Sequence, residues 1–374
     1  MTRVLFFEVD SVFGGIESFL LNMVRNVDLK NGEFKFDFVT SANNPAASED
    51  FKKAGVHIIN VGNKKNIVHY YRNLNTIFAK GNYNIVHIQK NSLSNPLPLI
   101  LAKKHHVPFI LHAQNSAPSI SNAIIRNIHI INRWLYANKA STRLACGETA
   151  AKWMFNTLEG VRIVKNGINP EEFKLNEEVR HQVRKEHNIS NDDLVICNVG
   201  RFTDQKNHKF IIQVFYEIYK KSQSSKLFLV GDGTNMTNIK ELVRNLKIER
   251  NVVFFGSLER DQESKVLMSA DVFLMPSIYE GVSIASVEAQ MAGLQLIMSD
   301  TVDKDTNITG DVIFLSLDKH PREWAEIIIK QASTNRFKYD YKSIVNRIRK
   351  AGYDMKYTSE NLLKLYAAKG NKEC

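Results

Sequence analysis

Two glutamates in the C-terminal half have the type and spacing of ligand-binding residues. Glu280 precedes a glycine in SIYEGVSIASVEAQMAG (277–293), and Glu288 follows inside what the pattern predicts to be a helix. On a helical wheel, Glu288 lies at the edge of the arc of apolar side chains. A carboxylate that faces a core is costly unless it is paired or hydrogen-bonded, and the sequence offers no obvious partner nearby. We therefore expect a ligand at Glu288, with a helix-favouring acid in the first turns as the alternative.

The same helix and an earlier loop supply groups that suit a diphosphate. In VGRFTDQKNH, Arg201 and Lys206 follow a predicted strand and combine a planar fork with a point charge. The helix N-terminus adds backbone amides in a favourable dipole. These amides are expected from Gly281, Val282, Ser283 and Ile284. Glu280 and Glu288 would then accept hydrogen bonds from hydroxyl groups of the ligand.

The N-terminal half offers weaker candidates. Gly14 and Gly15 stand between a predicted strand and a helix, where a glycine pair either lets an anion approach the backbone or forms a tight turn. His112 ends a strand in PFILHAQNS, and a lone histidine there is more often structural than catalytic. His87 has the same position on the preceding strand, so that one imidazole could support the other.

Metal and nucleophile signatures are weak. Asp303 and Asp305 form a D-x-D in a polar loop, which favours a turn over a metal site. The three cysteines, Cys146, Cys197 and Cys374, have neither pairing nor metal-ligand spacing. No G-x-G-x-x-G after a strand, no P-loop and no Ser-His-Asp order is evident. We expect no metal ion.

Two series of β-rich runs alternating with helical patterns must position these residues. The first runs from VLFFEV to PFILHA, and the second runs from LVICNVGR to DVIFLSL. This rhythm predicts an α/β protein with two doubly wound parallel-sheet, Rossmann-like domains. We place the N-terminal domain at 1–170, together with a final helix at 355–374, and the C-terminal domain at 171–354.

Composition limits the class of protein and its partners. The 374 residues carry a net charge of +11, which favours an anionic partner such as nucleic acid, acidic lipid or a nucleotide diphosphate. No zinc-finger spacing, aromatic RNA-binding signature or long basic tract supports nucleic acid. No apolar run approaches the ~18 residues of a spanning helix, and the start of the chain lacks the pattern of a signal peptide. These features predict a cytoplasmic protein.

The motifs together resemble the retaining glycosyltransferases of family 4, and most closely the EpsF-like exopolysaccharide and capsule branch. The matching pieces, in the family's order over about 300 residues, are FGGIESFLLNMV, ILHAQN, VKNGIN, VGRFTDQKNH, LVGDG, VVFFGSL and SIYEGVSIASVEAQMAGL. The family's fold is GT-B, in which two Rossmann-like domains face each other across a cleft. The N-terminal domain would then be the acceptor side and the C-terminal domain the nucleotide-sugar side.

The resemblance implies a role for each candidate residue. Arg201 and Lys206 would hold the donor diphosphate, Glu288 the ribose and Glu280 the donor sugar. Gly14 and Gly15 would approach the phosphates from the other domain, and His112 would contact the transferred sugar. The branch usually reads H-x-H-N here, whereas Gln114 replaces the second histidine, and Gln89 follows His87 where histidine is common.

The implied activity is hexosyl transfer, with retention and without a metal or cofactor. The donor would be a nucleotide diphosphate sugar, with a UDP-sugar expected, and the acceptor a growing surface or exopolysaccharide glycan, lipid-linked in this branch. A nucleotide-sugar epimerase or a phosphorylase on the same fold is the alternative enzyme. A non-catalytic partner subunit of a glycosyltransferase complex is the alternative outside catalysis. A degenerate subunit would not need to keep all four of Arg201, Lys206, Glu280 and Glu288.

One further stretch bears on location. SNAIIRNIHIINRWLYANKASTR (121–143) interleaves apolar residues with cations. The apolar set is Ile124, Ile125, Ile128, Ile131, Trp134 and Leu135, and the cations are Arg126, Arg133, Lys139 and Arg143. Such a mixture suits a helix at the surface of an anionic membrane, which would place the protein at the inner face of the cell membrane. The alternative is that the apolar face packs on the N-terminal sheet and the cations are solvated.

Overall fold

The computed structural model describes residues 1–11, 14–114, 123–332 and 340–370. The chain forms two compact units. The first comprises Met1–Gly167 and the helix that starts at Met355, and the second comprises Ile168–Asp354. The boundary expected at residue 170 therefore falls at the start of the second unit, in the short helix η3 (Pro170–Phe173). Residues 371–374 of the expected final helix lie outside the described residues.

A parallel sheet forms the centre of the first unit. Its strand order is β3-β2-β1-β4-β5-β6-β7. The strands are β1 (Thr2–Val9), β2 (Phe34–Thr40), β3 (His57–Asn60), β4 (Ile85–Lys90), β5 (Phe109–Ala113), β6 (Thr142–Ala145) and β7 (Val161–Ile163). The central strands are nearly continuous apolar runs because helices cover both faces of the sheet.

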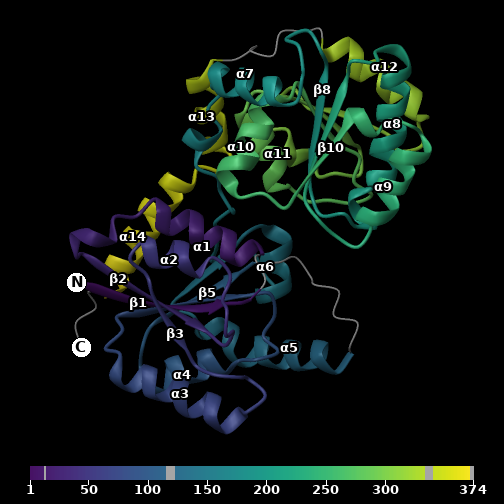
Figure 1. The fold of residues 1–374 in the computed structure, drawn as a ribbon. Coiled ribbons are helices and arrows are strands. Elements are labelled where there is room, and N and C mark those ends of the chain that lie inside the picture. Colours follow the sequence, from purple (N-terminus) through teal and green to yellow (C-terminus); the bar gives the residue numbers. More distant parts are fainter. Residues whose placement is uncertain (12–13, 115–122, 333–339, 371–374) are drawn as a thin grey trace. The chain divides into compact units, whose positions relative to one another are not determined.

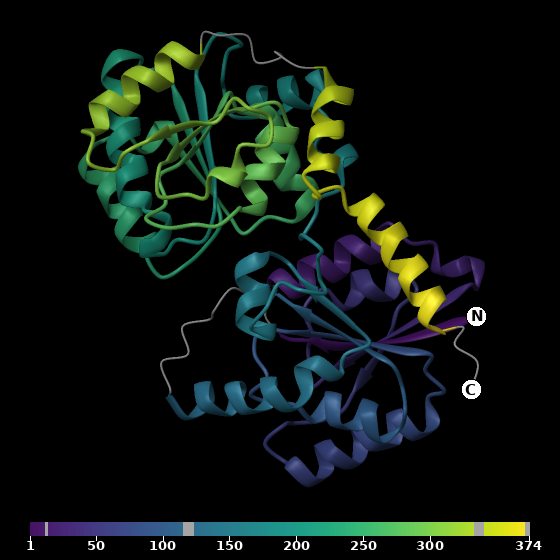
Figure 2. The ribbon, with the colours of Figure 1, turned by 180° about the vertical axis from the view of Figure 1, so that it is seen from behind.

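Helices cover the two faces of this sheet in separate groups (Figure 1). One face carries α1 (Gly15–Arg25), α2 (Ser48–Lys53) and α14 (Met355–Gly370). The other carries α3 (Ile67–Lys80), α4 (Leu97–Lys104) and α6 (Glu148–Phe155), with α5 (Ala123–Tyr136) further out. Two short helices, η1 (Leu29–Asn31) and η2 (Ala137–Lys139), complete the unit. Helix α14 lies beside α1, so the end of the chain returns to the N-terminal sheet (Figure 2).

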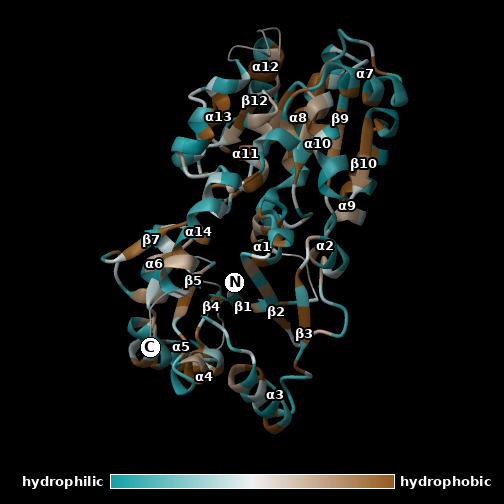
Figure 3. Ribbon diagram, turned by 90° about the vertical axis from the view of Figure 1, so that its left-hand side faces the viewer, coloured by the Kyte–Doolittle hydropathy of each residue, from teal (hydrophilic) through white to brown (hydrophobic). Residues whose placement is uncertain are grey.

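The second unit repeats the plan. Its parallel sheet has the order β10-β9-β8-β11-β12-β13. The strands are β8 (Val195–Val199), β9 (Lys226–Val230), β10 (Val252–Gly256), β11 (Val272–Met275), β12 (Gln295–Ser299) and β13 (Ile313–Leu315). The strands are largely hydrophobic and the helices alternate in hydropathy along their length, as expected for helices with one buried face (Figure 3).

The helices of the second unit also form two groups. One face carries α7 (Glu177–Glu186), α10 (Arg260–Ser269), α11 (Ile284–Met291) and α13 (Tyr341–Lys350). The other carries α8 (His208–Lys221), α9 (Met236–Asn245) and α12 (Pro321–Ala332). The short helices are η4 (Asp204–Lys206), η5 (Glu249–Asn251) and η6 (Lys304–Thr306). The prediction of two doubly wound parallel-sheet domains is confirmed.

No helix in the described parts of either unit is long and apolar enough to span a bilayer.

Candidate functional site

The strongest candidate site lies at the carboxyl ends of two central strands of the second sheet. Strands β8 and β11 are parallel neighbours, so the loops that leave their carboxyl ends start side by side. The loop after β8 contains Arg201 and Lys206, and the loop after β11 contains Glu280. The topology therefore brings together residues that are far apart in the sequence.

A charged contact joins the two loops. Lys206 Nζ donates to Glu280 Oε2 at 2.5 Å, and the lysine side chain is only 14% exposed. Gln205, which the sequence did not single out, strengthens the junction. Its side-chain Nε2 donates to the backbone carbonyl of Tyr279 at 3.0 Å. Its backbone carbonyl accepts from the Ile278 N–H at 2.8 Å. Lys206 and Glu280, which are both predicted to bind the nucleotide-sugar substrate, are thus in direct contact.

Arg201 lies in the same loop but differs from Lys206. It is exposed, and its guanidinium group forms no hydrogen bond or ion pair with any described residue. Its five N–H donors therefore remain available to an anion, whereas Lys206 already has Glu280 as a counter-ion. A diphosphate here would meet one available fork and one cation that can exchange partners.

Two glycines after β9 let the neighbouring loop approach closely. Gly231 has φ +128°, and a Cβ there would lie 2.1 Å from the carbonyl oxygen of Gly200. A Cβ at Gly233 would lie 2.6 Å from the carbonyl oxygen of Phe202. Any side chain at either position would displace the backbone that precedes Lys206. These glycines belong to LVGDG. They shape the loop after β8 that contains Arg201 and Lys206, which we call the cation loop, through contacts that the sequence does not display.

The start of helix α11 differs from the prediction. The helix begins at Ile284 with Ser283 as its N-cap, so Gly281 and Val282 lie in the preceding loop rather than at the helix end. The N–H groups of Ser286 and Val287 already bond the Ser283 carbonyl. The expectation that Gly281 and Val282 supply helix N-terminal amides is therefore wrong, because the glycine and its neighbour extend the turn before the helix starts.

Glu288 has a partner that the sequence did not reveal. It is buried on α11, and its Oε1 lies 2.8 Å from Arg260 Nη1 on α10. Arg260 also bonds Glu172 through Nε at 2.7 Å, and its guanidinium lies 4.9 Å from the ring centre of Phe173. The absence of a nearby partner in the sequence therefore does not require a ligand, since an arginine from another helix compensates the charge of Glu288.

A second neighbour, Glu263 of α10, also contacts the buried carboxylate of Glu288. Its Oε1 has no aligned hydrogen bond among the described residues, although Arg260 lies within ion-pair distance. Burial, followed by the charge of Glu288, raises the pKa of Glu263 well above its usual range, so a protonated Glu263 can donate to Glu288. Glu288 is therefore held in place with its Oε1 buried, and its contact with a ribose hydroxyl stays a prediction.

The N-terminal unit has a polar pocket at the carboxyl ends of β1, β4 and β5. Its volume is about 580 Å³, and its walls include Gly14, Gly15, Gln89, Lys90 and Gln114. Gln114 Nε2 donates to Gln89 Oε1 at 3.1 Å. The other amide atoms of this pair, Gln114 Oε1 and Gln89 Nε2, are buried without a partner in the described residues. The two glutamines that depart from the family pattern therefore line the pocket as a hydrogen-bonded pair, with one polar atom of each buried and unpartnered among the described residues.

Gly14 does not offer a free amide in that pocket. Its N–H donates to Glu17 Oε2 at 3.1 Å, while Asp10 N–H donates to the other oxygen of Glu17 at 2.9 Å. This capping box satisfies the start of α1 internally. The Gly14 N–H is therefore occupied within α1, and a Cβ at Gly15, the first residue of α1, would lie 3.8 Å from Asn166 Nδ2. The approach of this glycine pair to the donor phosphates stays a prediction.

His112 lies behind the pocket wall rather than on it. Both His112 and His87 are fully buried, and His87 Nε2 lies 3.2 Å from His112 Nδ1. His87 Nδ1 in turn lies 2.7 Å from the hydroxyl of Tyr366 on α14. Gln114 Nε2 lies 3.2 Å from His112 Nδ1 and separates the imidazole from the pocket. Contact between His112 and a sugar stays a prediction.

Both histidines are neutral. Burial lowers the pKa of His112 to about 3 and lowers the pKa of His87 well below its usual value. A neutral His112 can orient Gln114 by a hydrogen bond but carries no charge at neutral pH. The two buried rings therefore extend a hydrogen-bonded chain from α14 to the pocket.

This burial predicts a specific dependence of stability on pH. The unfolded chain binds a proton at His112 near pH 6.5, whereas the folded chain does so only near pH 3. The contribution of neutral His112 to the free energy of unfolding is therefore fully present well above pH 6.5 and is lost as the pH falls. Between pH 7 and pH 5 this loss is about 2 kcal/mol. In urea titrations, His112→Asn should show a shallower loss of unfolding free energy over that range. Parallel pH curves for the two proteins would contradict the assignment.

Asp303 and Asp305 form a turn. Asp303 caps η6, and its Oδ1 accepts from the Asp305 N–H at 2.9 Å. Among the described residues, no three His, Cys, Asp or Glu side chains are grouped so that they could hold a metal ion.

Sequence comparison now identifies the family. Residues 179–335 match the family described as "Glycosyl transferases group 1". The chain is 30% identical over 371 residues to the protein of Bacillus subtilis named as the glycosyltransferase EpsF, covering 96% of this chain and 95% of that protein. The chain belongs to the group 1 glycosyltransferases. It is thus a glycosyltransferase that acts on nucleotide sugars.

A further sequence relative and a solved structure are similar to this glycosyltransferase. An Escherichia coli enzyme named UDP-Gal:alpha-D-GlcNAc-diphosphoundecaprenol alpha-1,3-galactosyltransferase is 25% identical over 246 residues, covering 63% of this chain and 62% of that enzyme. HepE of Anabaena, solved in complex with UDP and glucose, superposes with a TM-score of 0.77 at 13% identity, over 98% of this chain and all of HepE. This structural likeness confirms the GT-B fold class.

Proposed function

We propose that this glycosyltransferase moves a hexose from a UDP-sugar to a growing, lipid-linked surface or exopolysaccharide glycan with retention at the anomeric carbon. The observation that carries the donor half is the Lys206–Glu280 contact between the loops after β8 and β11, with the exposed Arg201 beside it. The HepE complex with UDP and glucose supports a UDP-sugar as the donor.

The donor diphosphate would bind at the loop after β8. Its negative charge pairs with Arg201 and displaces Glu280 from Lys206, which frees the Glu280 carboxylate for hydroxyl groups of the sugar. Because the two cations are positioned before the reaction, they stabilise the charge that develops on the leaving diphosphate. Glu288, fixed by Arg260, would accept a bond from a ribose hydroxyl.

The pocket of the N-terminal unit would take the acceptor side of the reaction. The amide groups of Gln89 and Gln114, which line this pocket, would suit hydroxyl groups, which both donate and accept. His112 orients Gln114 from behind the pocket and supports the transferred sugar. In a front-side route, a phosphate oxygen of the leaving group takes the proton of the attacking hydroxyl, so that the new bond forms on the face from which UDP departs.

A lipid-linked acceptor would place the enzyme at the inner face of the cell membrane. The name of the E. coli relative, whose acceptor carries a diphosphoundecaprenol group, supports this choice of acceptor. The resemblance to EpsF supports an exopolysaccharide or capsule product.

A donor screen tests the proposal. The protein is incubated with UDP-, GDP- and ADP-sugars in the presence of polyprenyl-diphosphate-linked mono- and disaccharides, and the released nucleotide and glycosylated lipid are measured. We expect turnover with a UDP-hexose, and proton NMR of the product should show the anomeric configuration of the donor. Turnover restricted to another nucleotide would reject UDP, and an inverted linkage would reject retention.

Metal independence gives a separate expected result. Arg201 and Lys206 would neutralise the charge of the diphosphate, as Mg²⁺ does in metal-dependent enzymes. Asp303 is already engaged as the cap of η6. Activity should persist after EDTA treatment, and Asp303→Asn combined with Asp305→Asn should change kcat/KM by less than about threefold. Loss of turnover on chelation that Mn²⁺ or Mg²⁺ restores would contradict this expectation.

A further inference from the structure

Helix α5 is attached to the protein by its polar side. His129 is its one buried side chain, and His129 Nδ1 accepts from the Leu93 N–H at 2.9 Å. Asn132 Nδ2 donates to the Leu93 carbonyl at 2.8 Å, and Arg133 Nη1 donates to the Trp153 carbonyl at 3.0 Å. The ring of His129 also stacks on Trp153 with a centroid separation of 4.1 Å. Hydrogen bonds, rather than an apolar face, therefore hold this helix.

The apolar residues of α5 face outward. The exposed fractions are 40% for Ile128, 42% for Ile130, 57% for Ile131, 79% for Trp134 and 40% for Leu135. The alternative in which this apolar face packs on the N-terminal sheet is therefore wrong. Contiguous exposed apolar residues of this size mark an interaction surface, because each would lower its free energy by leaving water.

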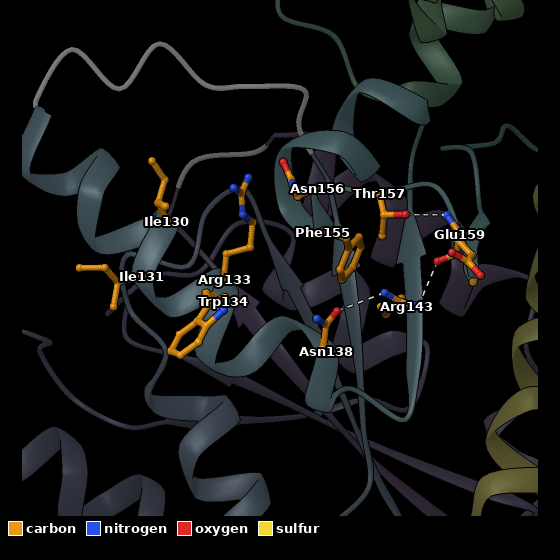
Figure 4. A pocket seen from close by; sticks show the side chains of 11 residues that line it. Ile130, Ile131, Arg133, Trp134, Asn138, Arg143, Phe155, Asn156, Thr157 and Glu159 are labelled. Carbon is orange, nitrogen blue, oxygen red and sulfur yellow. Dashed lines mark hydrogen bonds between the residues drawn. The ribbon is translucent and has the colours of Figure 1, made fainter.

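A cationic pocket adjoins this apolar surface. It has a volume of about 900 Å³, and Figure 4 shows Ile130, Ile131, Arg133 and Trp134 of α5 along one side of it. Phe155 and Arg143 line the other side, where Arg143 bonds Asn138 and the Glu159 carbonyl. Apolar groups and guanidinium groups thus share one surface.

Charge selects the occupant of this surface. Residues 123–165 contain seven Lys and Arg against two Glu, a net charge of +5, and among the described residues that line the pocket Glu159 is the one acid. A bilayer that contains anionic lipid offers both an apolar interior for the isoleucines and phosphate groups for the cations. A second copy of this chain would instead bring the same positive charge against itself.

We propose that α5 and its adjoining pocket bind the surface of an anionic lipid bilayer. Ile128, Ile131 and Trp134 insert at the level of the acyl-chain boundary, while Arg126, Lys139 and the pocket arginines contact lipid phosphates. The helix lies in the plane of the interface and does not cross it, in keeping with its 14 residues. The proposal deepens the proposed function, on which it rests for the lipid-linked acceptor, but membrane binding itself requires no turnover.

Vesicle binding tests the proposal with the full-length chain and without substrates. Flotation with phosphatidylglycerol–phosphatidylcholine vesicles at low salt should recover the protein with the vesicles, and phosphatidylcholine vesicles should recover much less. Trp134 fluorescence should shift to shorter wavelength on binding, and Trp134→Phe should abolish the shift. Ile128→Ser combined with Ile131→Ser should lower the partition coefficient at least tenfold. Arg126→Gln combined with Lys139→Gln should lower it about thirtyfold at low salt and little at high salt.

Ile67→Ser provides the matched control, because Ile67 is 73% exposed on α3 of the same unit. It should bind vesicles as the wild type does, and an equal loss would overturn the assignment to α5. Equal binding to neutral and anionic vesicles would overturn the role of charge. Failure to bind any vesicle, or a dimer that Ile128→Ser and Ile131→Ser dissociate, would overturn the proposal. UDP-sugar binding measured by calorimetry on the same variants should be unchanged, which separates this outcome from failure of the glycosyltransferase proposal.

Discussion

Replacing Arg201 or Lys206 by alanine should lower kcat/KM roughly thirtyfold to eight-hundredfold. This range corresponds to a loss of about 2–4 kcal/mol of transition-state stabilisation. In the proposed donor site, each change would remove a cation that stabilises the leaving diphosphate. The two variants should differ in the contacts that the free enzyme loses. Lys206→Ala breaks the bond to Glu280, whereas Arg201 is bonded to no described residue. Steady-state kinetics with a UDP-sugar and a lipid-linked acceptor measure both effects.

The Lys206–Glu280 contact makes a further demand on this result. If diphosphate binding releases Glu280 for the sugar, the effects of Lys206→Ala and Glu280→Ala should not add in a double-mutant cycle. Lys209→Ala is the matched control, because Lys209 is an exposed cation at the start of α8, three residues beyond Lys206. It should leave kcat/KM unchanged. Full activity in both Arg201→Ala and Lys206→Ala would exclude the cation loop as the diphosphate site.

Arg260→Met should destabilise the second unit by about 3–5 kcal/mol, the usual cost of removing one partner from a buried ion pair. The change leaves Glu172 and Glu288 without their shared cation, next to the raised-pKa carboxyl of Glu263. Two carboxylates would then face low-dielectric surroundings uncompensated. Thermal and urea unfolding, followed with and without UDP, measure the loss.

A surface pair on another helix gives the control for Arg260. Arg322 pairs with Glu326 on α12, but its side chain is 66% exposed. Arg322→Met should therefore leave stability unchanged within the error of the measurement. If Arg260→Met unfolds at the wild-type denaturant concentration, Glu288 does not depend on Arg260. If the variant stays folded but binds UDP more weakly, Arg260 acts by positioning Glu288 for the ribose.

The sheets could be predicted from the sequence because their strands lie between two layers of helices. A strand covered on both faces is apolar throughout, so runs such as LFLV (227–230) are visible without knowledge of their neighbours. Helix α5 shows the limit of this reasoning. Its periodicity indicates an amphipathic helix but not which side faces the protein, and the answer depends on Leu93 and Trp153 in other elements.

The candidate site divides in the same way. Lys206 and Glu280 were predicted from their positions after strands, and sheet topology explains why they meet. The partner of Glu288 could not be predicted, because Arg260 reaches it from α10, an element with no local sequence relation to α11. The burial of His112 could not be predicted either, because its ring packs against Phe19 of α1 and His87 of β4, which only the fold brings together.

The stoichiometry of the reaction tests the central claim most directly. With a UDP-hexose and a polyprenyl-diphosphate-linked acceptor, the wild-type protein should form one glycosylated lipid for each UDP released, and Lys206→Ala should reduce both in parallel. UDP released without glycosylated lipid, or a donor recovered as its epimer, would contradict the account.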